Sequence, residues 1–206
     1  MIHYEILDEP RIAILQPLTE LKDKFYLAGG TGLALQLGHR DSADFDFFSE
    51  DEFDTATLFQ KLEKILMGRK IEKVQEEKNT LSIIVDDDVK ISFFYYPYKM
   101  LNPLIEEPNL KIASIEDIAV MKASAIVSRA TLKDYVDLYF ILGKLSFEEI
   151  ITLAREKLPA LDENLIRKSL VFFEDVLEEA IIYKIDNQPS WEEIKDRIKK
   201  EVIQNN

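Results

Sequence analysis

Hydrophobic positions along the chain recur with two periods, one typical of helices and one typical of strands. Leucine and isoleucine three or four residues apart predict amphipathic helices before residue 70 and through most of the chain after residue 113. Aromatic and β-branched residues concentrate between these regions and predict strands. The expected helices are 8–21, 31–37, 54–67, 114–129, 131–143, one beginning at 146, 162–182 and 190–204. The expected strands are 25–28, 44–48, 81–85, 89–96 and an edge strand at 110–113.

Capping and turn residues support these boundaries. Gly38 and Gly68 follow periodic segments and are expected to end helices. Ser114 and Ser146 precede acidic first turns, as N-cap residues do. Three aspartates at 86–88 predict a hairpin turn, an interpretation favoured over a cation site because turns use Asp for backbone reasons.

The order of these elements predicts an α+β fold. We expect a mixed sheet with flanking helices in residues 1–113 and a C-terminal helical bundle in residues 114–206. The helical region is expected to pack on the sheet rather than stand apart.

Composition narrows the class of protein. The chain has 206 residues, 47% of them hydrophobic, which suffices for a core. It has no cysteine and two histidines, which argues against disulfides and a zinc site. No apolar run reaches transmembrane length and the N-terminus lacks a signal-peptide pattern, so we expect a cytoplasmic protein with no membrane partner. The net charge of −13 disfavours general nucleic-acid binding, allows a local basic groove and equally fits a basic protein partner.

Two short stretches are candidates for chemistry. Gly29, Gly30 and Thr31 stand between an apolar strand and a helix, where free N–H groups suit a phosphate; the alternative is a plain turn. Asp44 and Asp46 are two residues apart on the next strand, so both carboxylates are expected on one face. Such a pair suits Mg²⁺ with substrate phosphates; the alternative is a polar face in solvent.

Taken together, these stretches resemble the family of the abortive-infection toxin AbiEii, a group of minimal nucleotidyltransferases. The likeness runs from about residue 25 to 142. The matching residues are Gly29-Gly30-Thr31, Leu37-Gly38-His39-Arg40, Ser42-Ala43-Asp44-Phe45-Asp46-Phe47-Phe48 and Lys133-Asp134-Tyr135-Val136-Asp137-Leu138-Tyr139-Phe140. The resemblance implies a nucleotidyltransferase-type sheet, an NTP substrate, Mg²⁺ as cofactor, and a toxin of a toxin–antitoxin or phage-defence pair. It also implies tRNA or another RNA as acceptor, with protein hydroxyls as a further choice, and an antitoxin protein as partner.

The resemblance also assigns roles to residues of the second half. Lys122, which the sequence alone would allow to snorkel out of a buried helix, is expected to bind the nucleotide's phosphates, with Arg129 as a weaker companion. The resemblance places Asp137, and with a weaker match Asp134, in the active site. The implied role is either general base on the acceptor hydroxyl or orientation of Lys122. A surface ion pair between Lys133 and Asp137 is the plainer alternative.

Arg40 is expected either to reach a phosphate or to be a solvated loop cation. Many nucleotidyltransferases carry a third carboxylate on the strand after the hairpin, where this chain has Ser92. This departure leaves two protein carboxylates for metal and puts a full two-metal mechanism in doubt.

The expected function is therefore Mg²⁺-dependent nucleotidyl transfer from an NTP. We expect Asp44, Asp46 and Asp137 as catalytic residues, the two former as metal ligands, and Gly29, Gly30, Thr31, Arg40 and Lys122 as nucleotide-binding residues. The alternative is a catalytically decayed module that binds a nucleotide or a partner without turnover. A metal-dependent phosphoesterase is a third interpretation that no histidine cluster supports.

Overall fold

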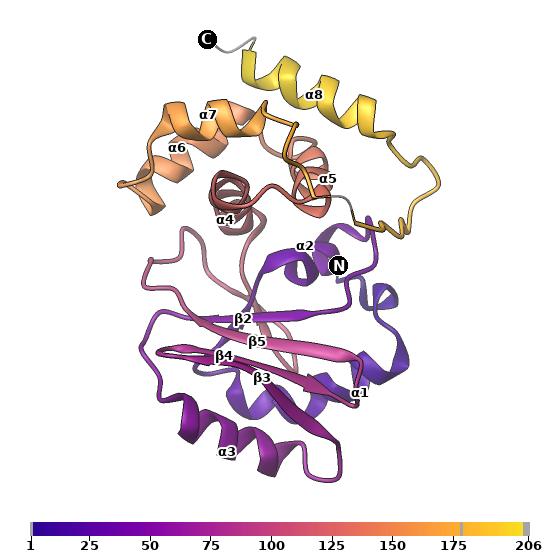
Figure 1. Ribbon diagram of the computed structural model, residues 1–206, viewed down its shortest axis with the longest axis vertical. Helices are drawn as coiled ribbons and strands as arrows, with labels where there is room; N and C mark the ends of the chain where they lie inside the picture. The colour runs from indigo at the N-terminus through magenta and orange to yellow at the C-terminus, as the bar shows by residue number, and fades with distance from the viewer. Residues whose placement is uncertain (1, 178, 204–206) are drawn as a thin grey trace.

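A seven-stranded mixed sheet with helices on both faces organises the computed structural model, which describes residues 2–177 and 179–203 (Figure 1). The helices are α1 (Glu9–Leu18), α2 (Gly29–Leu37), α3 (Thr55–Ile65), α4 (Ile115–Ser128), α5 (Leu132–Ile141), α6 (Phe147–Lys157), α7 (Glu163–Leu170) and α8 (Trp191–Ile203), with 3₁₀ turns at Tyr4–Ile6 and Thr19–Leu21. The strands are β1 (Tyr26–Leu27), β2 (Phe45–Ser49), β3 (Ile71–Glu77), β4 (Thr80–Val85), β5 (Val89–Tyr95), β6 (Ile105–Glu106) and β7 (Lys111–Ile112). The predicted α+β class is confirmed.

The strand order is β3-β4-β5-β2-β1-β7-β6, so β2 lies between β5 and β1. β2 runs parallel to β5 and antiparallel to β1. The register places Asp46 opposite Ser92 and Phe47 opposite Leu27. Because side chains alternate along a strand, Asp46 and Phe48 share one face of β2 while Phe45 and Phe47 share the other.

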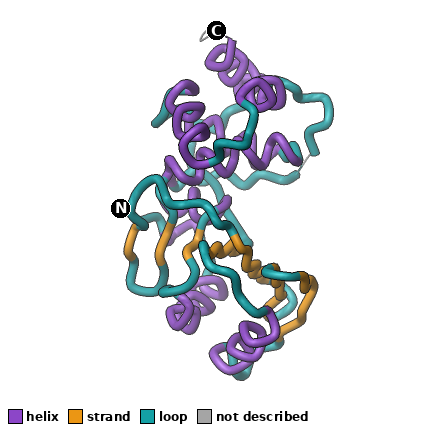
Figure 2. The backbone as a smooth tube through the Cα atoms, turned by 90° about the vertical axis from the view of Figure 1, so that its left-hand side faces the viewer, coloured by secondary structure: helices purple, strands orange, loops and turns teal. Residues whose placement is uncertain are grey.

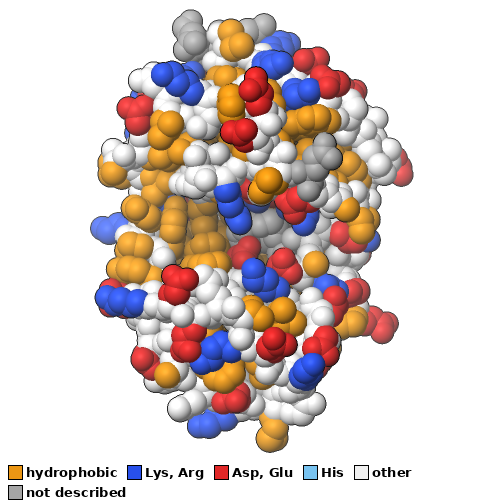
Figure 3. Space-filling view, viewed as in Figure 1, with side chains coloured by type: hydrophobic (Ala, Val, Ile, Leu, Met, Phe, Trp, Pro, Cys, Tyr) orange, Lys and Arg blue, Asp and Glu red, His pale blue; other side chains and the backbone are white. Residues whose placement is uncertain are grey.

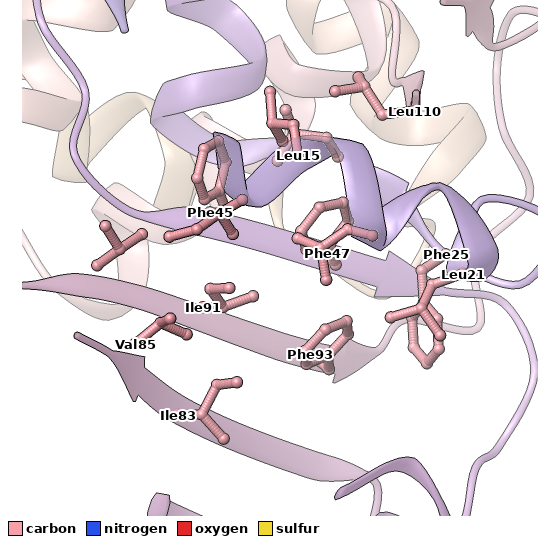
Figure 4. Packing of buried hydrophobic residues seen from close by; sticks show 14 of the residues in the cluster. Leu15, Leu21, Phe25, Phe45, Phe47, Ile83, Val85, Ile91, Phe93 and Leu110 are labelled. Atoms are coloured by element: carbon pink, nitrogen blue, oxygen red, sulfur yellow. The ribbon is translucent and has the colours of Figure 1, made fainter. Parts of the chain in front are cut away.

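The two faces of the sheet bury two different hydrophobic clusters. Phe45, Phe47, Ile91 and Phe93 pack on the face covered by α1 and α3 (Figure 4). The opposite face carries the second cluster, in which Tyr26 and Ala28 pack with the helices α4 to α8. The helices that follow the sheet in sequence thus lie together at one end of the molecule (Figures 1 and 2).

The boundary at residues 113/114 remains a prediction. The helical region shares one hydrophobic cluster with residues of β1 and α2, which agrees with packing on the sheet. No helix within the described part of the chain combines the length and the apolar content needed to cross a membrane.

Several local predictions are confirmed. Gly38 ends α2 with φ of 63°, and Gly68 has φ of 91° after α3. Ser114 and Ser146 accept hydrogen bonds from the first turns of α4 and α6, and Glu149 completes a capping box with Ser146. The aspartates at 86–88 join β4 to β5 as a hairpin, with Asp86 and Asp87 at positive φ.

Two predictions are wrong, and the strands β3 and β6 were not predicted. The strand expected at the edge near 110–113 is β7, and it is internal because β6 pairs with its outer side. The helix expected over 162–182 ends at Leu170, and the chain then continues without helix to α8. The strand β3 was not expected, since its exposed sequence has no hydrophobic alternation. Residues 178 and 204 of the predicted helices lie outside the described residues.

In place of the expected helix, the connection between α7 and α8 runs past the turn before α5 and then past Arg40. Leu177 exchanges backbone hydrogen bonds with the turn before α5, through Ala130 and Leu132. Further on, Tyr183 forms an isolated β-bridge with Arg40. This connection therefore covers the loop that joins α2 to β2.

Candidate active site

The two glycines of the predicted turn form the first turn of α2 itself, so the helix starts at Gly29 rather than at Thr31. Gly29 has φ of 61°, a conformation that glycine adopts without strain. The N-cap residue Ala28 offers no side chain to the first N–H groups of α2. The N-termini of α1, α3 and α4, by contrast, are capped by side chains. Uncapped N–H groups at a helix start favour an anion.

Asp46 lies directly against this turn. A Cβ atom built on Gly29 would lie 2.8 Å from Asp46 Oδ2, so a side chain at this position would displace the carboxylate. Ala28 N–H also donates a hydrogen bond to the Asp46 carbonyl, at 3.0 Å. Asp46 is half-buried, so its side chain is not completely removed from solvent.

Asp44 is placed differently from the prediction. It precedes β2, which begins at Phe45, and its side chain is exposed. The Thr31 hydroxyl donates to the Asp44 carbonyl and also hydrogen-bonds the Ser42 hydroxyl at 2.7 Å. These contacts tie the backbone of the acidic segment to the start of α2. Sequence analysis noted Ser42 only as part of a motif.

The charge state of Asp46 reflects both burial and neighbours. Desolvation raises the pKa of Asp46 above its ordinary value, and the Asp44 carboxylate raises it further. The cations Lys122, Lys90 and Arg129 act in the opposite direction and lower the Asp46 pKa. Among the described residues, neither Asp44 nor Asp46 forms an ion pair. Two unpaired carboxylates of this kind favour a bound cation.

Asp137 differs from Asp44 and Asp46, because it is fully buried and hydrogen-bond donors surround its carboxylate. Arg40 donates to both carboxylate oxygens, at 2.7 and 2.8 Å. Lys122 Nζ lies 2.6 Å from Oδ2, and His39 Nε2 donates to Oδ1 at 2.9 Å. Although burial opposes ionisation, Lys122 and Arg40 hold the pKa of Asp137 well below its ordinary value. This saturated carboxylate has no exposed oxygen to offer an acceptor hydroxyl.

Lys122 is held by two aspartates rather than snorkelling to solvent. Its Nζ lies 2.8 Å from Asp134 Oδ1 as well as 2.6 Å from Asp137 Oδ2. Thr131 fixes Asp134 in turn, at 2.9 Å. Because an ammonium has three N–H donors, one remains for a ligand. The pKa of Lys122 is raised, since the two carboxylates outweigh its desolvation, and the side chain stays charged.

Arg40 is not the solvated loop cation that one interpretation expected. Its side chain is 3% exposed, and its guanidinium lies over Gly30, where a built Cβ would meet Nη2 at 2.6 Å. Neighbouring His39 is buried beside Phe140, and desolvation lowers its pKa, so the imidazole is neutral at pH 7. Sequence analysis gave His39 no role; its place before Arg40 in the matching motif was the available signal.

The alternative interpretation of Asp137, a surface ion pair with Lys133, is wrong. Lys133 turns to Glu179, with Nζ and Oε2 2.7 Å apart, because Asp137 points inward toward Arg40 and Lys122. Arg129 lies at the exposed end of α4. Lys90, which sequence analysis did not single out, is exposed on β5 near enough to Asp46 to lower its pKa.

Ser92 occupies the sheet position beside Asp46. It is buried, and its hydroxyl accepts a hydrogen bond from Ser82 at 3.1 Å. No cluster of three acidic or histidine side chains in the described residues is arranged to hold a metal ion. The unpaired carboxylates of Asp44 and Asp46 fit a hard divalent cation that takes its other ligands from phosphate and water.

Comparison with known proteins agrees with this architecture. Residues 13–204 match the model of a family described as the nucleotidyl transferase AbiEii toxin of a type IV toxin–antitoxin system. A protein of Aquifex aeolicus, described as uncharacterized, is 39% identical over 188 residues, which covers 86% of each chain.

Solved structures share the fold at low sequence identity. The nucleotidyltransferase toxin MenT4 of Mycobacterium tuberculosis aligns with a TM-score of 0.63 and 16% identity, over 93% of this chain and 80% of that one. A putative nucleotidyltransferase of H. pylori aligns with a TM-score of 0.51 and 20% identity, over 80% and 76% of the two chains. The nucleotidyltransferase-type fold predicted from the sequence is confirmed by these neighbours.

Proposed function

The chain belongs to the AbiEii family of nucleotidyltransferase toxins, and from that premise we propose that it transfers a nucleoside monophosphate from an NTP to a hydroxyl group of an RNA or a protein. The observation that carries this proposal is the contact of Asp46 with Gly29. It brings a carboxylate that suits a cation beside a helix N-terminus that suits a phosphate.

We assign the triphosphate to the start of α2. The uncapped N–H groups of Gly29, Gly30 and Thr31 supply donors and the positive end of the helix dipole. Lys122 has one donor left after its two ion pairs, and its positive charge acts on Asp46. Arg40 adds a second positive charge beside Gly30. These groups are fixed before any ligand binds, so little reorganisation accompanies binding.

Asp44 and Asp46 are proposed to hold Mg²⁺ together with phosphate oxygens of the NTP. When bound, the cation would neutralise phosphate charge and polarise the α-phosphate. Its binding would also relieve the repulsion that Asp44 exerts on Asp46. The protein would then supply two of the metal ligands, and both carboxylates come from the segment next to the proposed phosphate-binding turn.

In the reaction, the acceptor hydroxyl oxygen forms a bond to the α-phosphorus, the bond to the β-phosphate oxygen breaks, and pyrophosphate leaves. The hydroxyl proton passes to solvent water. Asp137 is fully buried and saturated by His39, Arg40 and Lys122. This supports Asp137 as the residue that orients Lys122 and Arg40, rather than as the general base.

The biological setting follows from the family. We propose a toxin whose activity is kept in check by an antitoxin protein, in a system that serves phage defence. tRNA or another RNA 3′ end is the acceptor that the resemblance favours. The net charge of −13 means that an RNA must be held by a local group of cations rather than by the whole surface.

The test is label transfer from α-³²P-labelled NTPs to total RNA and to total protein in the presence of Mg²⁺. Asp44→Asn and Asp46→Asn are each expected to lower transfer by at least about 10³-fold, because the cation contributes several kcal/mol to the transition state. Asp51→Asn, in an exposed segment after β2, is the matched control and should retain transfer within about twofold. Full transfer by a folded Asp44→Asn variant would contradict the assignment.

One observation favours a second function. Ser92 stands beside Asp46 where a carboxylate would complete a two-metal site, as a decayed enzyme could also show. A module of this kind would bind Mg²⁺–NTP tightly in isothermal titration while releasing no pyrophosphate. Pyrophosphate release at any acceptor-dependent rate decides for the enzyme.

A further inference from the structure

A row of aromatic side chains continues the sheet face on which Asp46 lies. Phe48 follows Asp46 by two residues, and Phe94 follows Ser92 by two, so the two rings are neighbours across β2 and β5. Their centroids are 5.4 Å apart. Tyr96 lies 5.8 Å from Phe48, and Tyr98 lies 4.8 Å from Tyr96. We call Phe48, Phe94, Tyr96 and Tyr98 the aromatic row.

Part of this row is not explained by packing. Phe48 and Tyr96 contact the hydrophobic cluster beneath α4. Phe94 is only partly buried and belongs to neither hydrophobic cluster of the described residues, and Tyr98 is 39% exposed. Figure 3 shows the surface hollowed between the helices and the sheet, with hydrophobic side chains along one side of the hollow. Ring surface that packing leaves uncovered beside the proposed site is available to a planar ligand.

The strand order indicates which part of the substrate pair the aromatic row would contact. The Gly29 turn, assigned to the leaving pyrophosphate, lies on the β1 side of Asp46, whereas Ser92 and Phe94 lie on the β5 side. In-line displacement requires the attacking hydroxyl to approach opposite the leaving group. The acceptor must therefore enter over β5, and its end group comes beside Phe94.

Charge on the same strand favours a phosphodiester chain. Lys90 precedes Ser92 by two residues on the same face as Phe94. Lys90 and Arg129 lie near enough to Asp46 to lower its pKa, and neither forms an ion pair with a residue that the structure describes. A cation and a partly buried aromatic ring about 14 Å apart along one strand match the backbone and base of a single-stranded nucleic acid.

We propose that the aromatic row, led by Phe94, stacks the terminal base of a single-stranded RNA acceptor, while Lys90 contacts its backbone. This inference rests on the proposed function and specifies its acceptor site. A stacking surface reads no base edges, so it accepts different terminal bases. Phe94 is thereby a positioning residue that sets the terminal ribose over Ser92.

The test uses two probes: a five-nucleotide RNA with 2-aminopurine as its 3′-terminal base, and the α,β-methylene analogue of ATP with Mg²⁺. Phe94→Leu is expected to weaken binding of the RNA probe about tenfold and to leave the affinity for the ATP analogue unchanged. The matched control, Phe172→Leu, alters an exposed phenylalanine, 47% exposed, that lies after α7 and outside the sheet. It should change neither affinity by more than about twofold.

Each other result overturns the proposal. Loss of ATP-analogue binding in Phe94→Leu would assign the ring to the donor base. An unchanged affinity for both probes would make the ring a surface residue, and failure of the unaltered protein to bind the RNA probe would exclude an RNA acceptor here. Lys90→Gln should weaken binding of the RNA probe and leave the affinity for the ATP analogue unchanged. Its matched control, Lys78→Gln, should change neither affinity. Failure of the proposed function appears separately, as undiminished Mg²⁺–nucleotide binding by Asp44→Asn.

Discussion

Two buried charged clusters involve α4, one at its first turn through Asp117 and one at its middle through Lys122. Both contain a Lys–Asp ion pair, but the pairs serve different purposes. At the start of the helix, Lys157 and Asp117 are both fully buried, with Nζ and Oδ1 2.7 Å apart. The Asp117 carboxylate also accepts hydrogen bonds from the backbone of Leu101 and from Ser114. These contacts fix the loop after β5 to α4 and α6.

The second cluster surrounds Asp137, and it is incomplete. Asp137 is saturated, but Lys122 is 9% exposed and has one donor unused. The nearby carboxylates of Asp44 and Asp46 have no ion-pair partner among the described residues. A closed ion pair holds architecture, whereas a cluster with unused donors and acceptors is prepared for a charged ligand.

The largest expected effect is on stability in the closed cluster. Lys157→Met leaves the Asp117 charge buried without its cation, and should lower the free energy of unfolding by about 3–5 kcal/mol. Its transfer activity per folded molecule should stay within about twofold, because Lys157 contacts none of the residues assigned to the metal or the triphosphate. In the aromatic row it contacts Tyr96, with Nζ 5.5 Å from the ring centroid. Urea unfolding and active-site-normalised label transfer measure the two quantities. If Lys157→Met lost transfer activity and kept its full free energy of unfolding, this distinction between the two clusters would be wrong.

Lys122→Met is the corresponding change in the open cluster. It removes a fixed positive charge that acts beside Asp46, and should lower transfer by about 100-fold or more, which equals about 2.7 kcal/mol of transition-state stabilisation. Arg40 and His39 still pair with Asp137, so we expect a smaller loss of folding stability than in Lys157→Met. Single-turnover transfer separates the chemical step from nucleotide binding. Unchanged turnover in this variant would remove Lys122 from the site.

The smallest expected effect is a gain in stability on Asp46→Asn. Burial and Asp44 raise the Asp46 pKa, so its ionised form is less favourable in the folded state than in the unfolded state. Removing the charge should stabilise the ligand-free protein by up to about 1 kcal/mol, or about 2–4 °C in Tm.

This gain has a defined pH dependence. Below the unfolded value of 3.8, Asp46 is protonated in both states and the variant gains nothing. The gain develops as the pH rises through the raised folded pKa and is complete above it. Thermal unfolding of both proteins between pH 4 and 8 measures the difference. A variant that is less stable than the unaltered protein at pH 8 would indicate an ion pair at Asp46.

Local signals in the sequence predicted much of the fold, because the chemistry that sets each boundary is local. Gly38 ends α2 in the left-handed conformation, and Ser146 with Glu149 caps α6. The exposed strand β3 escaped prediction because neither of its faces is buried, so hydrophobic alternation is absent. The continuation of α7 was overestimated, since long-range backbone contacts to Ala130 and His39 hold that segment instead.

In the candidate site, too, some contacts could be predicted from local sequence signals and others could not. The contact between Asp46 and the glycine turn followed from a strand, a short helix and an adjacent strand in sequence. The partners of Asp137 could not be found locally, because Arg40 is 97 residues away and the nearer Lys133 pairs with Glu179. Sequence shows that a buried acid needs a partner, and only the fold selects which cation provides it.

The most direct test of the central claim is an anomalous-scattering map of crystals containing Mn²⁺ and the α,β-methylene analogue of an NTP. We expect metal density beside the carboxylates of Asp44 and Asp46, with the triphosphate on the N–H groups of Gly29 and Gly30 and within reach of Lys122. Triphosphate bound elsewhere, or metal density away from Asp44 and Asp46 while the analogue is bound, would contradict it.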